Sequence, residues 1–257
     1  MYNQLTAEDF RRALHLPPDY TVDGVLCWGT MRKKKHRAEL ESVLSRLGLT
    51  AAFHYVEESG FFENIADLYI DGKRIWFDSS YGGAYLSELL HVACLLGSRK
   101  NILVGSCAGL HPNGNVGDIV IPVSSYGNES STRMYEPGNG EFVYFSDEGL
   151  RTSLKDRIGD RFRVFEGGLM TCQANLMESW EDVVRWSSEG YVGIDMESAT
   201  LFAVSNHFKV PSAALLPIVD NMIKQHTVFS EGHPGWRERL QEARFEIFRV
   251  AFEELLT

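Results

Sequence analysis

The chain has 257 residues, of which 44% are hydrophobic and 23% are charged, and its formal net charge is −10. This length is sufficient for one large α/β domain with a full core, and the composition is that of an ordinary globular protein. The acidic balance argues against a nucleic-acid or anionic-membrane partner, because both require a basic face. The longest apolar runs have the length of strands, which is too short to span a bilayer.

The N-terminus and the cysteines indicate the compartment. Residues 1–9 are polar and acidic, without the basic start and apolar block of a signal peptide. The sequence contains no C-x-x-C pair and no Cys/His spacing typical of a metal site, and its cysteines are scattered at Cys27, Cys94, Cys107 and Cys172. We therefore expect reduced thiols, a cytoplasmic location and no metal.

The first half of the chain alternates strand-sized apolar runs with segments of helical period. The dipeptide Asp71-Gly72 between two alternating runs is a strong hairpin signal. The predicted elements are a strand at 24–28, a helix at 32–47, hairpin strands at 65–70 and 73–78, a helix at 84–96, and strands at 101–104 and 117–123.

The second half continues the alternation after a segment rich in Ser, Gly and Asn at 124–140. We predict that this segment is a long mobile loop that acts as a lid or a subunit contact. The predicted elements are a helix at 147–158, a strand at 162–167, a helix at 180–188, strands near 193–195 and 213–219, and a helix at 235–255. The pattern predicts a single α/β domain over 1–257, in three layers, with a central mixed β-sheet flanked by helices and an N-terminal extension at 1–23.

Two carboxylates follow short apolar strands in the second half. Glu197, in the pair Met196-Glu197, opens a helix after the strand that ends near Asp195, and Asp220 ends the strand at 213–219. Ligands of open α/β sheets bind at the carboxyl ends of the strands. A buried carboxylate needs partners, which ligand hydroxyls would supply. The alternative for Asp220 is a surface turn residue that caps the next segment.

Glycine turns follow three of the predicted strands. In the segment 104–110, small residues would let backbone N–H groups approach an anion, and Ser106 adds a hydroxyl. The alternative is that these residues form a tight turn with no ligand. Gly82-Gly83 is open to the same two interpretations. The turn at Gly29 opens a helix with four consecutive cations. Either it is an anion cradle with Arg32 or Lys33 turned inward, or it is a solvated basic helix face.

Four motifs, in the order and spacing found here, carry a family resemblance over about residues 24–254. They are VGSCAG at 104–109, VGDIV at 116–120, GIDMESA at 193–199 and PIVD at 217–220. Together they resemble the nucleoside phosphorylase family, which holds purine nucleoside phosphorylase, uridine phosphorylase and methylthioadenosine nucleosidase. The resemblance implies the fold of that family and cleavage of the N-glycosidic bond of a nucleoside.

The resemblance also implies roles for matched residues. Glu197 would hold the ribose 2′ and 3′ hydroxyls, and Met196 would pack under the sugar, which becomes oxocarbenium-like in the transition state. Asp220 would protonate or hydrogen-bond purine N7 and make the base a better leaving group. The Gln and Arg that bind uracil in uridine phosphorylases would fall near Trp180 and Asp182, where neither type is present. This disfavours a pyrimidine substrate.

The resemblance also implies a base pocket and a phosphate site. An aromatic residue that stacks on the base in many members would align near Leu176 or Met177, so the pocket is expected to be softer and wider, with Trp180 supplying a ring. The candidate base-pocket residues are Cys107, Ala108, Leu176, Met177 and Trp180. The candidate phosphate-binding residues are Gly29, Arg32, Lys33 and Ser106.

The departures from the family concern the nucleophile. Phosphorylases carry an arginine two residues before the glycine of the Gly-Ser loop, where this chain has Leu103, and a second family arginine has no clear counterpart at 61–64. Each lost charge-assisted hydrogen bond costs about 1.5–3 kcal/mol, unless Arg133 or another cation substitutes. The hydrolase branch, however, carries an acid just after the first strand, where this chain has Arg32, and it lacks the N-terminal extension.

These observations favour one reaction and leave two alternatives open. The prediction is phosphorolysis of a purine-type nucleoside to free base and ribose 1-phosphate, with inorganic phosphate as co-substrate and no cofactor. Phosphate-independent hydrolysis by a nucleosidase of the same family, or nucleoside binding without turnover, are the alternatives. The family also implies a homo-oligomer, either a dimer or a hexamer.

Overall fold

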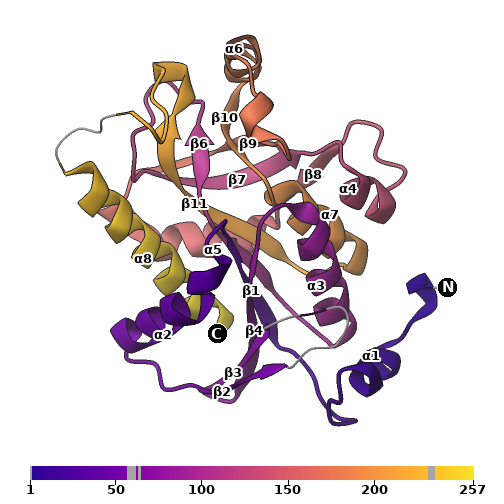
Figure 1. The fold of residues 1–257 in the computed structure, drawn as a ribbon. Helices are drawn as coiled ribbons and strands as arrows, with labels where there is room; N and C mark the ends of the chain where they lie inside the picture. The colour runs from indigo at the N-terminus through magenta and orange to yellow at the C-terminus, as the bar shows by residue number, and fades with distance from the viewer. Residues whose placement is uncertain (1, 57–61, 63–64, 231–234) are drawn as a thin grey trace.

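The computed structural model describes residues 2–56, 62, 65–230 and 235–257. In this part of the chain, eleven strands form one mixed sheet in the order β2-β3-β4-β1-β5-β11-β6-β10-β9-β7-β8 (Figure 1). The strands are β1 Gly24–Gly29, β2 Ala52–Val56, β3 Ile65–Ile70, β4 Lys73–Ser80, β5 Asn101–Val104, β6 Cys107–Gly109, β7 Ile119–Tyr126, β8 Val143–Phe145, β9 Val164–Thr171, β10 Tyr191–Asp195 and β11 Ser212–Asn221.

Helices cover both faces of this sheet. The α-helices are α1 Ala7–Ala13, α2 His36–Leu47, α3 Gly83–Leu95, α4 Ser130–Tyr135, α5 Glu148–Ile158, α6 Trp180–Ser188, α7 Ser198–Phe208 and α8 Trp236–Leu255. Short 3-10 turns are η1 Tyr2–Gln4, η2 Lys33–Lys35, η3 Gly159–Arg161, η4 Asn175–Met177 and η5 Met222–Lys224. The predicted α/β domain with a central mixed sheet between helical layers is therefore confirmed.

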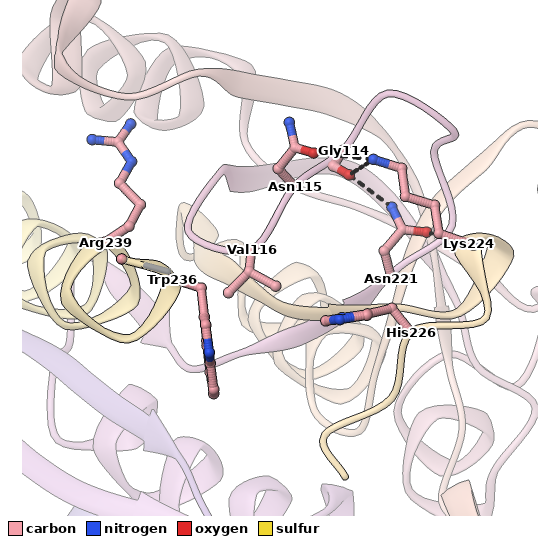
Figure 2. A pocket seen from close by; sticks show the side chains of 9 residues that line it. Gly114, Asn115, Val116, Asn221, Lys224, His226, Trp236 and Arg239 are labelled. Atoms are coloured by element: carbon pink, nitrogen blue, oxygen red, sulfur yellow. Dashed lines mark hydrogen bonds between the residues drawn. The ribbon is translucent and has the colours of Figure 1, made fainter. Parts of the chain in front are cut away.

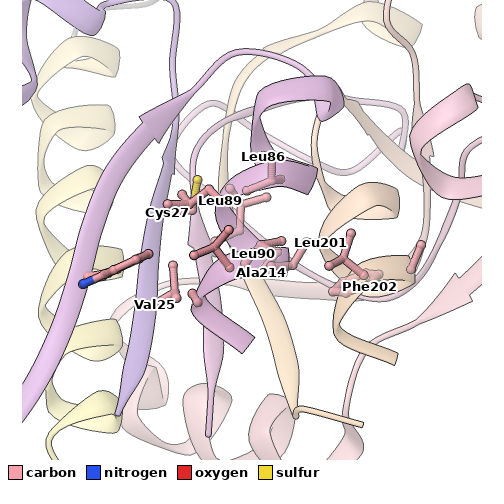
Figure 3. Close-up of a cluster of buried hydrophobic side chains, with 14 of the residues drawn as sticks. Val25, Cys27, Leu86, Leu89, Leu90, Leu201, Phe202 and Ala214 are labelled. Atoms are coloured by element: carbon pink, nitrogen blue, oxygen red, sulfur yellow. The ribbon is translucent and has the colours of Figure 1, made fainter. Parts of the chain in front are cut away.

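Strand β1 shows how the two cores form. Successive side chains of a strand point to opposite faces, so Val25 and Cys27 join a cluster with α3 and α7, which includes Leu89 and Phe202 (Figure 3). Leu26, between them, joins a second cluster with α2, α5 and α8. Both clusters are buried apolar layers, one on each face of the sheet.

Helix α8 runs antiparallel to β1 on the second face. Its C-terminal end lies at the start of β1, because a Cβ added at Gly24 would stand 2.7 Å from Leu255 Cδ2. Two turns earlier, the Phe248 ring lies 6.0 Å from the ring of Trp28, near the end of β1. The N-terminal half of α8 therefore continues past the carboxyl end of β1.

Most predicted elements are confirmed, including the hairpin between β3 and β4. Its turn residues, Asp71 and Gly72, both have positive φ, at 50° and 82°, as a two-residue hairpin requires. The prediction of a long loop at 124–140 is wrong. Strand β7 continues to Tyr126, and α4 follows because Glu129 and Thr132 form a reciprocal capping box.

Besides α4 and the 3-10 turns, four short elements were not predicted: β2, β6, β8 and α1. Strand β6 falls within the predicted glycine turn at 104–110; all three of its residues pair with β11, and Ala108 and Gly109 also pair with β10. Helix α1 lies in the N-terminal extension and begins with a capping box between Thr6 and Asp9. No helix in the described ranges is both long and apolar enough to cross a bilayer.

Candidate active site

Glu197 lies at the junction of β10 and α7, as the N-cap of the helix. Its side chain is buried, and the backbone N–H of Gly82 donates to Oε1 at 2.7 Å. A Cβ added at Gly29 would stand 3.0 Å from Oε2, so the end of β1 closes against the other oxygen. The carboxylate is thus held between the turn that precedes α3 and the end of β1.

One buried acid, Asp195, and one partly buried acid, Glu129, lie near Glu197. Asp195 accepts hydrogen bonds from Thr171 Oγ1 at 2.7 Å and Ser198 N at 2.8 Å, and Glu129 accepts one from Thr200. Burial raises the pKa of each of the three carboxyls, and the charge of Asp195 further raises the pKa of Glu197. No Lys or Arg side chain among the described residues forms an ion pair with Glu197, so a ligand that hydrogen-bonds the carboxyl would satisfy it.

Gln173 ties Met196 to the same turn. Its Nε2 donates to the Met196 carbonyl at 2.6 Å, and its Oε1 accepts from Gly83 N at 3.3 Å. Sequence analysis did not identify Gln173, because a glutamine in a polar segment belongs to no motif. Its two bonds fix the backbone just before Glu197 relative to the start of α3.

Asp220 lies within β11, not after it as the sequence had suggested. A register shift between Ile218 and Asp220 opposite β6 marks an irregularity in the ladder. The side chain is 8% exposed, and its Oδ1 is buried with no hydrogen-bond donor among the described residues. Burial raises the pKa of Asp220 to about 6, against the hydrogen bond from Val228 N and the charge of His226, which lower it. The carboxyl can therefore carry a proton near neutral pH.

The strands that carry the two predicted acids, β10 and β11, run in opposite directions. Strand β6 separates β10 from β11, running parallel to β11 and antiparallel to β10. In these ladders, Ala108 pairs with Ile194 on one side and with Asp220 on the other. The strands that carry the two acids therefore lie on either side of a three-residue strand, which the sequence pattern did not reveal.

Glu178 is a further acid near Asp220, and sequence analysis missed it. It lies between η4 and α6, with its Oε1 buried and without a hydrogen-bond donor among the described residues. Burial raises the pKa of Glu178 to about 7; a hydrogen bond with Cys172 lowers it, and the charge of Asp220 raises it. Glu178 and Asp220 therefore interact, although 42 residues separate them and no periodic pattern links them.

The loops after β1 and β5 meet beside Glu197. A Cβ added at Gly105 would stand 3.5 Å from the Cα of Gly29, and Ser106 follows at the partly exposed surface. Leu103 is fully buried, and its Cδ1 would lie 3.5 Å from a Cβ at Gly29. An apolar side chain therefore fills the position at which the resemblance expects an arginine.

The predicted cations lie outside this apolar packing. Arg32 is exposed, and its backbone N–H donates to Thr30 Oγ1 at 3.0 Å. Arg133 is exposed on α4 and donates to the Glu129 carbonyl at 3.3 Å. The Lys33 side chain and residues 61, 63 and 64, where the second family arginine would fall, lie outside the described structure. The phosphate-binding role of these residues stays a prediction.

The five candidate base-pocket residues divide into two groups. Cys107 and Ala108 lie in β6, next to Asp220, and the buried thiol of Cys107 has a pKa raised by burial and by the charges of Asp195 and Asp220. The other three lie in η4 and at the start of α6, and their exposed fractions are 91% for Leu176, 80% for Met177 and 46% for Trp180. Their contact with a base stays a prediction.

A cavity of about 460 Å³ lies beside the end of β11, between the 114–116 turn and the start of α8 (Figure 2). Its lining includes Asn221, His226, Trp236 and Arg239, and none of the predicted site residues. Asn221, the residue after Asp220, turns its amide away from the acid to donate to the Gly114 carbonyl at 3.0 Å. Two residues of the cavity lining therefore lie next to Asp220: Asn221 follows it in the chain, and the charge of His226 acts on its carboxyl.

Known proteins are similar to this chain in sequence and in fold. Purine nucleoside phosphorylase DeoD-type of Clostridium beijerinckii is 24% identical over 57% of this chain and 61% of its own length. Purine nucleoside phosphorylase DeoD-type 2 of Vibrio vulnificus is 23% identical over 77% and 86%, and guanosine phosphorylase of Halorubrum lacusprofundi is 26% identical over 50% and 53%. The chain thus spans about three-fifths of the first of these relatives and about half of the last.

The fold comparison covers almost the whole molecule. The crystal structure of uridine phosphorylase from Vibrio fischeri, complexed with 6-hydroxy-1-naphthoic acid, superposes with a TM-score of 0.70. It is 16% identical and the match covers 95% of this chain and 93% of that one, so it shows the same fold. The sequence model of the phosphorylase superfamily matches residues 82–249, which is more than half of the chain. The chain therefore belongs to the phosphorylase superfamily.

Proposed function

We propose that this protein cleaves the N-glycosidic bond of a purine-type nucleoside by phosphorolysis, which gives the free base and ribose 1-phosphate. The observation that carries the proposal is the pair of buried carboxyls that flank β6. Glu197 has no cationic partner among the described residues, and Asp220 holds a raised pKa of about 6 with one buried oxygen unsatisfied. One carboxyl suits sugar hydroxyls, and the other suits a base that must accept a proton.

The chemistry needs both acids and an external nucleophile. A phosphate oxygen forms a bond to C1′ as the bond from C1′ to the base nitrogen breaks, and the electron pair of that bond goes to the base. Asp220 supplies the proton that the departing purine takes at N7. Glu197 accepts hydrogen bonds from the ribose hydroxyls, and its ionised form, with one negative charge, favours the cationic sugar of the transition state.

A purine is proposed because of the acid at position 220. A purine offers N7 as a ring nitrogen that can take the proton of Asp220, and two of the named relatives above are purine nucleoside phosphorylases. A pyrimidine has no corresponding ring nitrogen, so the carboxyl would be left unsatisfied. Rates with inosine, guanosine, adenosine and uridine measure this preference, and a faster rate with uridine would contradict it.

Hydrolysis is the second candidate, and one observation favours it. Leu103 is fully buried beside Gly29, where the family resemblance expects the arginine that grips phosphate. In hydrolysis a water oxygen would form the bond to C1′, and free ribose would replace ribose 1-phosphate.

The two reactions differ in their need for phosphate. The experiment follows base release from inosine, guanosine, adenosine and methylthioadenosine, with and without added phosphate, and assays ribose 1-phosphate directly. Base release that requires phosphate and yields the sugar phosphate supports phosphorolysis, and undiminished release in its absence supports hydrolysis. Binding of a nucleoside measured by calorimetry, with no base released under either condition, would leave a binding protein.

A further inference from the structure

The cavity of about 460 Å³ beside the end of β11 has a volume typical of pockets for small organic ligands, which span about 300–1,000 Å³. Among the described residues that line it, none has a role in the proposed function. A Cβ added at Gly117 would stand 2.5 Å from Arg239 Cγ, so the first turn of α8 packs on the turn that precedes β7. On the other side, the Gly114 carbonyl accepts from Asn221 Nδ2 at 3.0 Å and from Lys224 Nζ at 2.6 Å. These contacts fix the two walls of the cavity relative to each other.

Aromatic and apolar side chains face the interior of the cavity. Figure 2 shows the indole of Trp236, the imidazole of His226 and the side chain of Val116 around the same space. Trp236 is the first residue of α8 and is partly exposed, and the guanidinium of Arg237 lies 5.3 Å from the centroid of its ring. A planar ring that packs on this indole would remove apolar surface from water and gain an aromatic contact.

An ammonium group and an amide lie together at the rim. Lys224 is exposed, and no carboxylate among the described residues forms an ion pair with it. Its Nζ donates to the Gly114 carbonyl and, at 3.0 Å, to Asn115 Oδ1, so one of its three N–H groups remains. The Asn115 amide nitrogen has no acceptor in the described part of the chain. Two adjacent donors therefore match the two oxygens of a carboxylate.

The surrounding charges also favour an anion. The guanidinium of Arg239 turns away from the cavity to donate to a backbone carbonyl at 3.3 Å, and it lies 4.0 Å from Glu242 (Figure 2). Burial raises the pKa of the neighbouring Asp118, whereas the charges of Arg163, Arg239 and Lys224 lower it. In these interactions three cations face two carboxyls, so the balance of charge is positive.

We propose that this cavity is a second ligand site, which binds a planar aromatic carboxylate. The ring of the ligand packs against Trp236 and Val116, and its carboxylate accepts from Lys224 Nζ and Asn115 Nδ2. A carboxylate suits the rim better than a phosphate dianion does, because one lysine supplies a single positive charge. This site does not depend on the reaction proposed above, since its ligand need be neither substrate nor product.

The test measures binding to the full chain by calorimetry, without nucleoside. The probes are 2-naphthoate and the neutral 2-naphthamide, which has nearly the same shape. Lys224→Gln should raise the Kd for 2-naphthoate by about 5-fold, because an exposed ion pair is worth up to about 1 kcal/mol. The same variant should leave the Kd for 2-naphthamide unchanged. Lys209→Gln is the matched control, because Lys209 is also exposed but lies at the C-cap of α7, before β11 begins, and it should match the wild type with both probes.

Two further variants test the ring contact. Trp236→Leu removes the indole and should raise the Kd for both probes by about 10-fold. Val116→Phe fills part of the cavity and should weaken both probes by about 10-fold. Thermal unfolding of each variant shows whether a lost affinity is a lost fold, and the exposed position of Lys224 keeps the charge test independent of folding.

Three results would overturn the proposal. The first is no saturable binding of 2-naphthoate at millimolar concentration. The second is an equal Kd for 2-naphthoate in Lys224→Gln and Lys209→Gln, which would exclude the anionic contact. The third is an affinity that falls in Glu197→Gln but not in Val116→Phe, which would place the probe in the candidate active site. The proposed function fails separately, because base release is not measured in any of these experiments.

Discussion

Replacing Asp220 with asparagine should make the protein more stable and less active. Asparagine keeps the shape of the side chain and an oxygen that can accept from Val228 N, but it does not ionise. Burial raises the pKa of Asp220 from 3.8 to about 6 in the folded chain. The native state therefore holds its proton more tightly than the unfolded state does, and stability falls as pH rises from about 4 to about 6.

The size of the effect follows from the shift. Each pKa unit corresponds to about 1.4 kcal/mol, so a shift of about two units costs up to about 3 kcal/mol above pH 6. The side chain is only 8% exposed, so solvent screening reduces this little. Asp220→Asn should match the wild type in free energy of unfolding near pH 4 and exceed it by up to about 3 kcal/mol at pH 8.

Urea denaturation of both proteins between pH 4 and pH 8 measures this difference. The same change at the exposed Asp156 of α5 is the control, and it should alter stability little at any pH. A stability difference that does not vary with pH would refute the reasoning, because the carboxyl of Asp220 would then not change its protonation on folding.

Activity provides the second half of the same prediction. Loss of a positioned general acid typically costs 10²- to 10⁴-fold, and Asp220→Asn should lose about this much of its kcat/KM on a purine nucleoside. In the wild type, kcat/KM should decline as pH rises above about 6, because the acid must hold its proton, and this limb should be missing from the variant. Full activity in Asp220→Asn would exclude the acid role.

Two other substitutions test the surroundings of the acids. Gly29→Ala would place a Cβ 3.0 Å from Glu197 Oε2, so the carboxylate must move by a few tenths of an ångström. We expect kcat/KM to fall by about 10-fold. An unchanged kcat/KM would show that sugar binding does not depend on this oxygen. Glu178→Gln should also raise the free energy of unfolding at pH 8. The charge of Asp220 is one cause of the raised pKa of Glu178, so the increase in the double variant with Asp220→Asn should be smaller than the sum of the two single increases. Strictly additive gains in a double-mutant cycle would show that the two carboxyls do not interact.

Local sequence determined most of the secondary structure. The hairpin at Asp71-Gly72, the helix at 180–188 and the final helix follow from turn chemistry, capping and period, and the structure confirms all three. The error at 124–140 has a local cause. A composition rich in Ser, Gly and Asn concealed a capping box between Glu129 and Thr132 and the helix that it starts.

The candidate site was only partly accessible to sequence reasoning. Glu197 and Asp220 could be selected because each follows an apolar strand in a family-like motif. Glu178 and Gln173 could not, because their partners lie in distant segments and neither belongs to a periodic or motif-like pattern. Glu178 matters because its Oε1 is buried without a hydrogen-bond donor among the described residues, and Gln173 matters because it bonds to Met196 and Gly83. Both are properties of the packed structure.

The sequence by itself determined that the chain alternates strands and helices and that it carries two strand-associated acids, because local propensity and hydrophobic period act over a few residues. The family resemblance added that Leu103 stands where an arginine is expected. Only the tertiary structure decided that β6 separates the strands of the two acids, that Glu178 lies close enough to interact with Asp220, and that α8 continues past the end of β1. Those relations join segments that can lie more than two hundred residues apart, and they arise only when both apolar faces of the sheet are buried against their helices.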